Sequence, residues 1–268
     1  MNIYTVCQFN VEQGVEEKVK VEKKIDFSFV DIHIHILYDV DDGPHNINTS
    51  IEMVKTAYNE GTRKIVATPH YHPAKCMMDY EELYRIFEIF KEQVKDTCPE
   101  MQFALGREIY YTSDIPDELE AGKHLTMGNS KYVLVEYQPT VDYNYLRTSI
   151  SNIIQMGYIP LIAHIERYMC IVKEIDRAYE LSNMGAFIQV NASSVIGESG
   201  KDIKKFIKKL MKDEMVDVIG TDAHSNGGRA PRIRECAEYI CKKFGYDYAK
   251  RVLHDNAELI LQGKYLEE

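Results

Sequence analysis

The hydrophobic residues of this chain fall into short apolar runs that alternate with longer amphipathic stretches, from about Phe27 onward. Short apolar runs bounded by polar turns are typical of buried β-strands. The seven runs are Phe29–Leu37, Lys64–Thr68, Phe103–Tyr111, Tyr132–Tyr137, Ile159–Ile165, Phe187–Val190 and Val216–Gly220. A regular alternation of strands and helices favours an α/β fold built on a parallel sheet.

The stretches between the runs predict helices. The clearest is Asp79–Asp96, where four apolar side chains recur on one face and Asp79 can serve as the N-cap. The other predicted helices are Ile51–Glu60, Tyr143–Met156, Val172–Met184, Asp202–Lys212, Ile233–Phe244 and Tyr248–Leu261. Glycine directly follows three of them, as expected at helix C-termini. About 240 residues in this pattern suit a TIM-like barrel, with an open doubly wound sheet as the alternative.

The first residues differ from the rest. Residues 1–26 are rich in Glu and Lys and contain only one short alternating stretch, so we expect an N-terminal extension there. No linker rich in Pro, Gly or Ser interrupts residues 27–268, which we therefore expect to form a single domain.

Composition and charge narrow the class of protein. Hydrophobic residues make up 45% and charged residues 28% of the 268 residues, as in ordinary globular proteins. The net charge of −10 argues against nucleic acid as a partner. No apolar run approaches the ~20 residues that span a bilayer, so we expect no membrane insertion. The N-terminus lacks an apolar signal region, and the six cysteines form no C-x-x-C pair, so we expect a cytoplasmic location.

The first apolar run carries the first candidate chemistry, in the sequence Asp31-Ile32-His33-Ile34-His35. Because strand side chains alternate between faces, we expect His33 and His35 to point one way together with Asp31, and the isoleucines to point the other way. Two imidazoles about 7 Å apart along one strand can converge on a single metal ion.

Similar residues close most of the later runs. The further candidate ligands are His70, Glu108, Glu136, His164, Asp222 and His224, with Asp42 in the acidic turn after the first run. In a barrel, the C-terminal ends of the strands meet on the face that carries the active site. All nine candidates offer nitrogen or oxygen and none offers a thiolate, which favours a catalytic cluster of Mn, Fe or Zn. Nine ligands are too many for one ion, so two or three ions fit better.

Two arginines follow these candidates closely in sequence. Arg167 comes three residues after His164, and Arg229 comes five residues after His224. A guanidinium group binds phosphate oxygens in a fork and stabilises charge that develops in a transition state. The pair favours phosphoester over amide chemistry, although surface ion pairs are the alternative role for each.

Aromatic residues near the candidate ligands leave two roles open. Tyr110 and Tyr111 follow Glu108 and either line an aromatic pocket or pack in the core. His72, two residues after His70, either faces the substrate or lies in a solvated loop.

Five motifs together resemble the PHP (polymerase and histidinol phosphatase) superfamily. They are D-x-H-x-H at 31–35, D-G-P at 42–44, R-E-I-Y at 107–110, A-H-I-E-R at 163–167 and D-x-H-x(4)-R at 222–229. Within that superfamily, residues 29–265 are most similar to the bacterial capsule-biosynthesis protein-tyrosine phosphatases.

The resemblance implies a distorted, PHP-type (β/α)7 barrel that holds three divalent metal ions, commonly Mn. It assigns His33, His35, Glu108 and Asp222 to one ion, Glu108, Glu136 and His164 to a second, and Asp42, His70 and His224 to a third. It also implies that Arg167 and Arg229 bind phosphate. The implied substrate is phosphotyrosine on a bacterial tyrosine autokinase that controls capsular polysaccharide synthesis, and a homo-oligomer is left open.

Three other functions remain as alternatives. Another PHP phosphoesterase, such as a histidinol phosphatase, would use the same metals and arginines. An amidohydrolase on a related barrel shares the H-x-H strand, but it normally has two metals and often a bridging lysine. A non-catalytic PHP module that binds metal or a partner is the third alternative, and metal-replete protein without hydrolytic activity would favour it.

Overall fold

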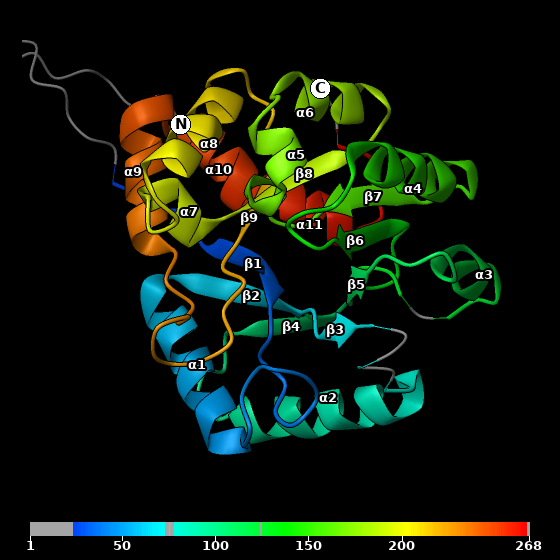
Figure 1. Cartoon of the computed structure of the whole chain (residues 1–268). Helices are drawn as coiled ribbons and strands as arrows, with labels where there is room; N and C mark the ends of the chain where they lie inside the picture. The colour runs from blue at the N-terminus through cyan, green and yellow to red at the C-terminus, as the bar shows by residue number, and fades with distance from the viewer. Residues whose placement is uncertain (1–23, 73–74, 76–77, 124, 267–268) are drawn as a thin grey trace, which may run out of the picture.

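The computed structural model describes residues 24–266, apart from residues 73–74, 76–77 and 124. Within these residues, strands and helices alternate along the chain (Figure 1). The strands are β1 (Phe29–Ile34), β2 (Thr62–Ala67), β3 (His70–Tyr71), β4 (Gln102–Leu105), β5 (Glu108–Tyr110), β6 (Tyr132–Glu136), β7 (Ile159–Ile162), β8 (Phe187–Asn191) and β9 (Val218–Gly220). The helices are α1 (Ile47–Glu60), α2 (Tyr80–Val94), α3 (Ile115–Glu120), α4 (Tyr143–Gln155), η1 (Ile165–Arg167), α5 (Met169–Val172), α6 (Asp176–Asn183), α7 (Ala192–Ile196), α8 (Lys201–Lys212), α9 (Arg234–Phe244), α10 (Tyr246–Lys250), η2 (Arg251–Asp255) and α11 (Asn256–Leu261).

The strands form a curled parallel sheet. One part has the order β1-β2-β4 and the other has the order β3-β5-β6-β7-β8-β9. A parallel bridge between Ile34 and Ala223 joins the end of β1 to the segment after β9, so the two parts curl around one interior. The prediction of a distorted barrel is therefore confirmed, and the open doubly wound sheet is not observed.

The third predicted strand is broken in two, and a short strand that was not predicted, β3, follows the second. Pro69 separates β2 from β3, since proline has no N–H to donate to the ladder. Gly106 and Arg107 separate β4 from β5. The pairing nevertheless continues across both breaks, because Gly106 N donates to Ala67 O at 2.8 Å and Glu108 N donates to Pro69 O at 3.2 Å.

The pairing register of β1 with β2 shifts between Asp31 and Ile34. An extra residue of this kind reverses which face the following side chains occupy. Ile32 accordingly packs in the cluster that contains Leu134, whereas Ile34 packs in a different cluster with α1 and α2 side chains. The expectation that Asp31 shares a face with His33 and His35 is wrong for this reason. Asp31 instead accepts hydrogen bonds from the backbone and hydroxyl of Thr221.

Local signals fixed several helix ends as predicted. Asp79 caps α2 by accepting a hydrogen bond from Glu81 N at 2.8 Å. Gly61 ends α1 with a φ of 104°, a conformation that favours glycine. The helix predicted over Val172–Met184 is wrong at residues 173–175, because the chain forms α5 and α6 with a turn between them. Arg177 donates to Cys170 O at 2.9 Å and so satisfies a carbonyl at that turn.

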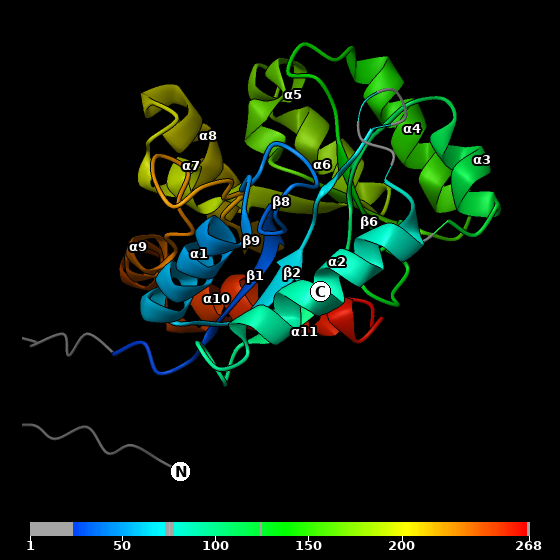
Figure 2. The same ribbon diagram turned by 90° about the horizontal axis from the view of Figure 1, so that it is seen from below.

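Apolar side chains fill both sides of the sheet. Inside, Leu134, Leu161 and Val218 meet Ile260 of α11. Outside, α1 and α2 pack on β2 and β4, while α4, α6 and α7 pack on β7 and β8 (Figures 1 and 2). No helix in the described part of the chain is both long and apolar enough to cross a membrane.

Most of the predicted extension over residues 1–26 lies outside the described residues. Of its last residues, Ile25 packs against the outer core and Asp26 accepts a hydrogen bond from Tyr246. The domain boundary between residues 26 and 27 stays a prediction.

Candidate metal centre

The nine predicted ligands come together at the C-terminal ends of the strands. His33 and His35 lie at the end of β1, His70 begins β3, Glu108 begins β5 and Glu136 ends β6. His164 follows β7, Asp222 and His224 follow β9, and Asp42 lies in the loop between β1 and α1. Eight of the nine form three groups whose ligand atoms lie within 4.8 Å of one another. The ninth, His164, contacts Glu108 directly, with Nε2 at 2.8 Å from Oε1.

Glu108 lies at the centre of the cluster and is completely buried. Its Oε2 lies 3.1 Å from His33 Nε2, 2.9 Å from His35 Nε2 and 3.3 Å from His70 Nδ1. One carboxylate therefore faces four imidazoles, which is the arrangement of a bridging ligand between metal ions.

Two further carboxylates extend the cluster in different directions. Asp222 Oδ1 lies 3.6 Å from both His33 Nε2 and His35 Nε2. Asp42 Oδ1 lies 3.1 Å from His224 Nε2 and 3.4 Å from His70 Nε2. The Asp42 side chain is 64% exposed, whereas Asp222 is buried. The Asp42 side of the cluster is therefore the side that faces solvent.

Residues behind the ligands orient the histidine rings. Gln189 Oε1 lies 3.1 Å from His33 Nδ1, and Asp41 Oδ2 lies 2.7 Å from His35 Nδ1. An oxygen acceptor at Nδ1 holds a ring proton on that atom, so Nε2, which faces Glu108, is the nitrogen that would bind a metal ion in place of its proton. Neither residue was predicted from the sequence to have this role.

Asn191 completes this orienting layer. It accepts a hydrogen bond from Gln189 at 2.9 Å and donates one to Asp222 Oδ2 at 3.0 Å. The sixth apolar run seemed to lack a candidate ligand, yet its strand β8 supplies both amides. Side chains two residues apart lie on the same face of a strand. The spacing of the two amides was therefore the signal available in the sequence.

The carboxylates of Glu108 and Asp222 are held ionised. Burial alone would raise the pKa of Glu108, but His33, His164 and His35 hold it well below its usual value. Burial also opposes ionisation of Asp222, whose pKa is nevertheless lowered, chiefly by His33 and Arg167. His35 shows the reciprocal effect, since Asp41 and Glu108 raise its pKa well above the usual value despite burial.

The donor set fits divalent metal ions. Glu108 Oε2 is buried and makes no well-directed hydrogen bond with the described residues, although three imidazole nitrogens lie within 3.3 Å of it. A buried carboxylate oxygen in this state is costly, and bound cations would satisfy it. Nitrogen and oxygen donors without sulfur suit Mn, Fe or Zn in a catalytic site. The residues present therefore fit the metal-dependent chemistry expected from the sequence, and the role of each as a ligand stays a prediction.

Both predicted phosphate-binding arginines contact Asp222. Arg167 donates to Asp222 Oδ2, and Arg229 lies 3.1 Å from Asp222 Oδ1. Their side chains are 40% and 46% exposed. Asp222 can thus hold both guanidinium groups at the edge of the cluster while other N–H groups of each arginine face outward.

The backbone is strained at two of these positions. His164 has a φ of 32° and Asp222 has a φ of 52°, values that residues other than glycine rarely adopt. Strain of this kind persists where surrounding structure imposes it, and it gathers at functional sites.

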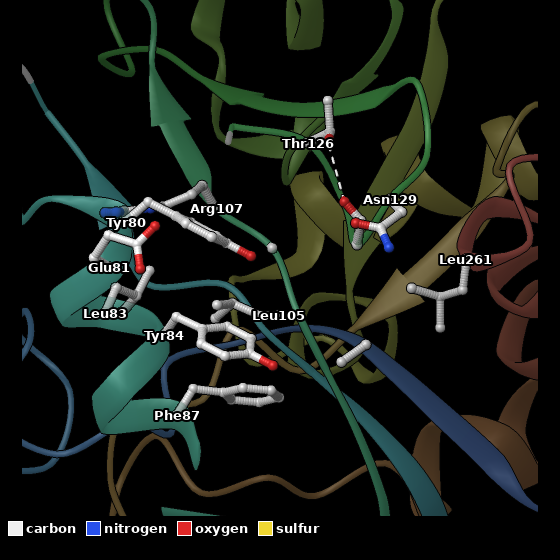
Figure 3. A pocket seen from close by; sticks show the side chains of 13 residues that line it. Tyr80, Glu81, Leu83, Tyr84, Phe87, Leu105, Arg107, Thr126, Asn129 and Leu261 are labelled. Atoms are coloured by element: carbon white, nitrogen blue, oxygen red, sulfur yellow. Dashed lines mark hydrogen bonds between the residues drawn. The ribbon is translucent and has the colours of Figure 1, made fainter. Parts of the chain in front are cut away.

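A separate cleft of about 590 Å³ lies beside the barrel, between α2, β4 and the end of α11. Tyr80, Tyr84 and Phe87 line one side of it, while Asn129 and Leu261 face them (Figure 3). None of the nine predicted ligands lines this cleft. Arg107 reaches it, but that residue donates to Met78 O at 2.6 Å, so we interpret its contact as support for the segment after β3.

Comparison with known proteins agrees with the geometry. A family model described as capsular polysaccharide synthesis, CpsB/CapC, matches residues 29–262. The tyrosine-protein phosphatase CpsB of Streptococcus agalactiae serotype V is 31% identical over 242 residues, which cover 88% of this chain and 100% of that protein. The tyrosine-protein phosphatase CpsB of Streptococcus pneumoniae is 33% identical over the same shares of the two chains.

The fold also matches solved structures. A chain from the study of YwqE from Bacillus subtilis and CpsB from Streptococcus pneumoniae, described as unique metal-dependent tyrosine phosphatases, superposes with a TM-score of 0.83 at 29% identity. The match covers 89% of this chain and 96% of that one. More distant hydrolases, with 11–15% identity and TM-scores of 0.51–0.57, share the fold alone.

Proposed function

Because the chain belongs to the CpsB/CapC family of capsular polysaccharide synthesis, we propose that it is a metal-dependent protein-tyrosine phosphatase in capsule synthesis. One observation carries the chemistry: a buried carboxylate, Glu108, faces four imidazoles next to two arginines that share Asp222. This combination suits hydrolysis of a phosphate monoester, because it provides sites for cations and for a phosphoryl group side by side.

We propose three divalent ions, with manganese as the first choice and iron or zinc as alternatives. His33, His35, Glu108 and Asp222 would hold one ion, Glu108, Glu136 and His164 a second, and Asp42, His70 and His224 the third. When bound, such ions activate water and neutralise charge on the phosphoryl oxygens.

The arginines of this chain would bind the phosphoryl group. Arg167 and Arg229 are anchored on one carboxylate, Asp222, and remain partly exposed. A guanidinium held in place by a buried anion loses little entropy when its other N–H groups bind phosphate oxygens. Positioned charge of this kind stabilises the transition state of phosphoryl transfer.

A tyrosine leaving group suits this site. The phenol has a pKa of about 10, so its oxygen needs less protonation on departure than the alkoxide of serine or threonine would. The proposed physiological substrate is a phosphotyrosine segment of a bacterial tyrosine autokinase, in keeping with the role that the family has in capsule synthesis.

The test compares hydrolysis of p-nitrophenyl phosphate and a phosphotyrosine peptide with and without Mn²⁺. Wild type should need metal, and His33→Ala should lose activity together with bound metal. His45→Ala is the matched control, because His45 is exposed and outside the cluster. Metal-loaded wild type that hydrolyses neither substrate would contradict the proposal. Faster hydrolysis of histidinol phosphate than of the peptide would favour the histidinol phosphatase alternative.

A further inference from the structure

We infer that His72 and Tyr110 form an aryl subsite that binds the ring of the phosphate ester. The inference rests on the proposed phosphatase function and adds a group that contacts the substrate beyond the phosphoryl position. Its consequence is a preference for aromatic over aliphatic phosphate esters that arises from binding and not only from leaving-group acidity.

The alternation of side chains places both residues directly beyond the metal cluster. His72 lies two residues after His70, and Tyr110 lies two residues after Glu108. His70 and Glu108 are register partners in the parallel pair β3–β5. Since residues two apart in a strand share a face, His72 and Tyr110 occupy the next layer on the face of those two ligands, one step further toward the C-terminal end.

A second strand confirms the position of Tyr110. Tyr110 is the register partner of Glu136 in the pair β5–β6, and Glu136 is 3.0 Å from His70 in the cluster. Tyr110 therefore lies beside a predicted ligand as well as above one. Both residues are half-buried, so each still offers surface to a ligand.

The two rings stack face to face. Their centroids are 4.4 Å apart and their planes differ by 20°. A stacked pair restrains both rings, so a third aromatic ring can pack against the pair without ordering loose side chains first. Contacts between aromatic rings change affinity by roughly 2- to 12-fold beyond the effect of area burial.

The neighbouring tyrosines show what a packing role looks like in these strands. Tyr71 and Tyr111 point to the opposite face and are buried in the outer core. The Tyr71 hydroxyl donates to Glu118, and the Tyr111 hydroxyl accepts from Asn152. The alternation thus settles the open roles of Tyr110 and Tyr111: Tyr111 packs in the core, whereas Tyr110 faces the site with His72.

The test measures binding, so that it does not depend on turnover. Isothermal titration calorimetry of the Mn²⁺-loaded full chain would give the dissociation constants of phenylphosphonate and methylphosphonate. These probes share the phosphoryl oxygens and differ in the ring. We expect wild type to bind phenylphosphonate more tightly, and Tyr110→Leu and His72→Leu to weaken that binding by about 3- to 10-fold with little change for methylphosphonate.

Matched variants separate the ring from other effects. Tyr110→Phe and His72→Phe keep a flat ring and should keep the preference, while Tyr84→Leu removes a 44% exposed tyrosine on α2 and should change nothing. Equal affinities of wild type for the two phosphonates would overturn the inference without any variant. Equal weakening of both probes in the leucine variants would also overturn it, because the change would then lie at the phosphoryl position.

The same data distinguish this inference from the proposed function. If wild type hydrolyses no phosphate ester but still prefers phenylphosphonate, the phosphatase proposal fails and the aryl subsite stands. If it hydrolyses phosphotyrosine but binds both phosphonates equally, the phosphatase proposal stands and the aryl subsite fails.

Discussion

At the scale of single residues, the expected metal affinity of the cluster depends on groups that are not predicted ligands. Asp41 accepts from His35 Nδ1, from His70 N at 2.9 Å and from Gly43 N at 3.0 Å. The Asp41 carboxylate therefore holds the His35 ring, the start of β3 and the turn at Gly43 in place. Partners of this kind set the orientation and basicity of a ligand, and their loss commonly costs 10- to 100-fold in metal affinity.

Asp41→Asn should accordingly weaken Mn²⁺ binding by about 10-fold or more, because an amide keeps the shape of the side chain but not its charge. Calorimetric titration of metal-free protein with Mn²⁺ would measure the change. Asp39→Asn is the control, since Asp39 is exposed in the same loop. If Asp41→Asn binds Mn²⁺ as tightly as wild type, Asp41 has no orienting role.

A substitution at Arg167 can test the fork geometry of the guanidinium separately from its positive charge. Arg167→Lys keeps a positive charge but cannot bind Asp222 and a phosphoryl group together in a fork. We expect kcat/KM for the phosphotyrosine peptide to fall by about 10²-fold, as for removal of a positioned transition-state donor. Arg147→Lys, on the exposed side of α4 where it pairs with Glu180, should leave the rate unchanged. Comparable rates for both variants would argue against a phosphate fork at Arg167.

The residues that sequence analysis identified and those it missed differ in one respect. His33, Glu108 and Asp222 lie in or just after apolar runs, so their types and positions alone indicated a cluster. Gln189 and Asn191 act only through contacts that β8 makes after folding, and amides carry no metal-binding signature of their own. Asp31 was placed on the wrong face because a shift of register in β1 depends on pairing with β2.

At the scale of elements, the approach of β9 to β1 decides where His33 lies. A Cβ added at Gly220 would lie 2.6 Å from His33 Cβ and 3.1 Å from His33 N. Real Cβ atoms do not approach other atoms this closely, so β9 must present glycine at this point. The close contact lets Asp222, two residues further on, reach the β1 histidines.

Gly220→Ala should therefore push β1 and β9 apart. We expect a loss of about 1–3 kcal/mol in the free energy of unfolding, together with weaker Mn²⁺ binding. Denaturant unfolding and metal titration would measure the two effects. Gly228→Ala is the control, because an added Cβ there meets nothing within 4 Å. Unchanged stability in Gly220→Ala would show that the strands separate without strain.

Helices and strands were predictable where the signal is local. The Asp79 cap and Gly61 needed only neighbouring residues, and both were correctly placed. The separation of α5 from α6 depends on contacts such as Arg177 with Cys170 O, and apolar periodicity continues through it. The division of the third apolar run into β4 and β5 likewise depends on which neighbours the two halves pair with in space.

At the scale of the whole molecule, one half-buried acid that is not among the predicted ligands makes stability depend on pH. Asp217 precedes β9, and its Oδ2 accepts from Ile188 N at 2.7 Å. Burial raises the pKa of this carboxyl to about 7, although Ile188 N and Arg251 act against the rise. The folded protein therefore holds a proton on Asp217 that the unfolded chain releases near pH 4.

The sign of the effect follows from linkage. The folded state binds more protons than the unfolded chain between about pH 4 and pH 7, so the stability supplied by this group is present at low pH and declines across that range. Asp217→Asn keeps an oxygen acceptor for Ile188 N and cannot ionise. It should raise the free energy of unfolding by roughly 2 kcal/mol at pH 8, allowing for partial exposure of the side chain, and by much less at pH 4.5.

Thermal unfolding of wild type and Asp217→Asn across pH 4.5–8 would measure this difference. Asp96→Asn is the matched control, because Asp96 is exposed after α2 and should give the same small change at every pH. The two curves for wild type and Asp217→Asn should approach each other toward low pH and separate toward high pH. Parallel curves would mean that the Asp217 carboxylate is equally well accommodated when ionised, and another acid would then have to account for any loss of stability between about pH 4 and pH 7.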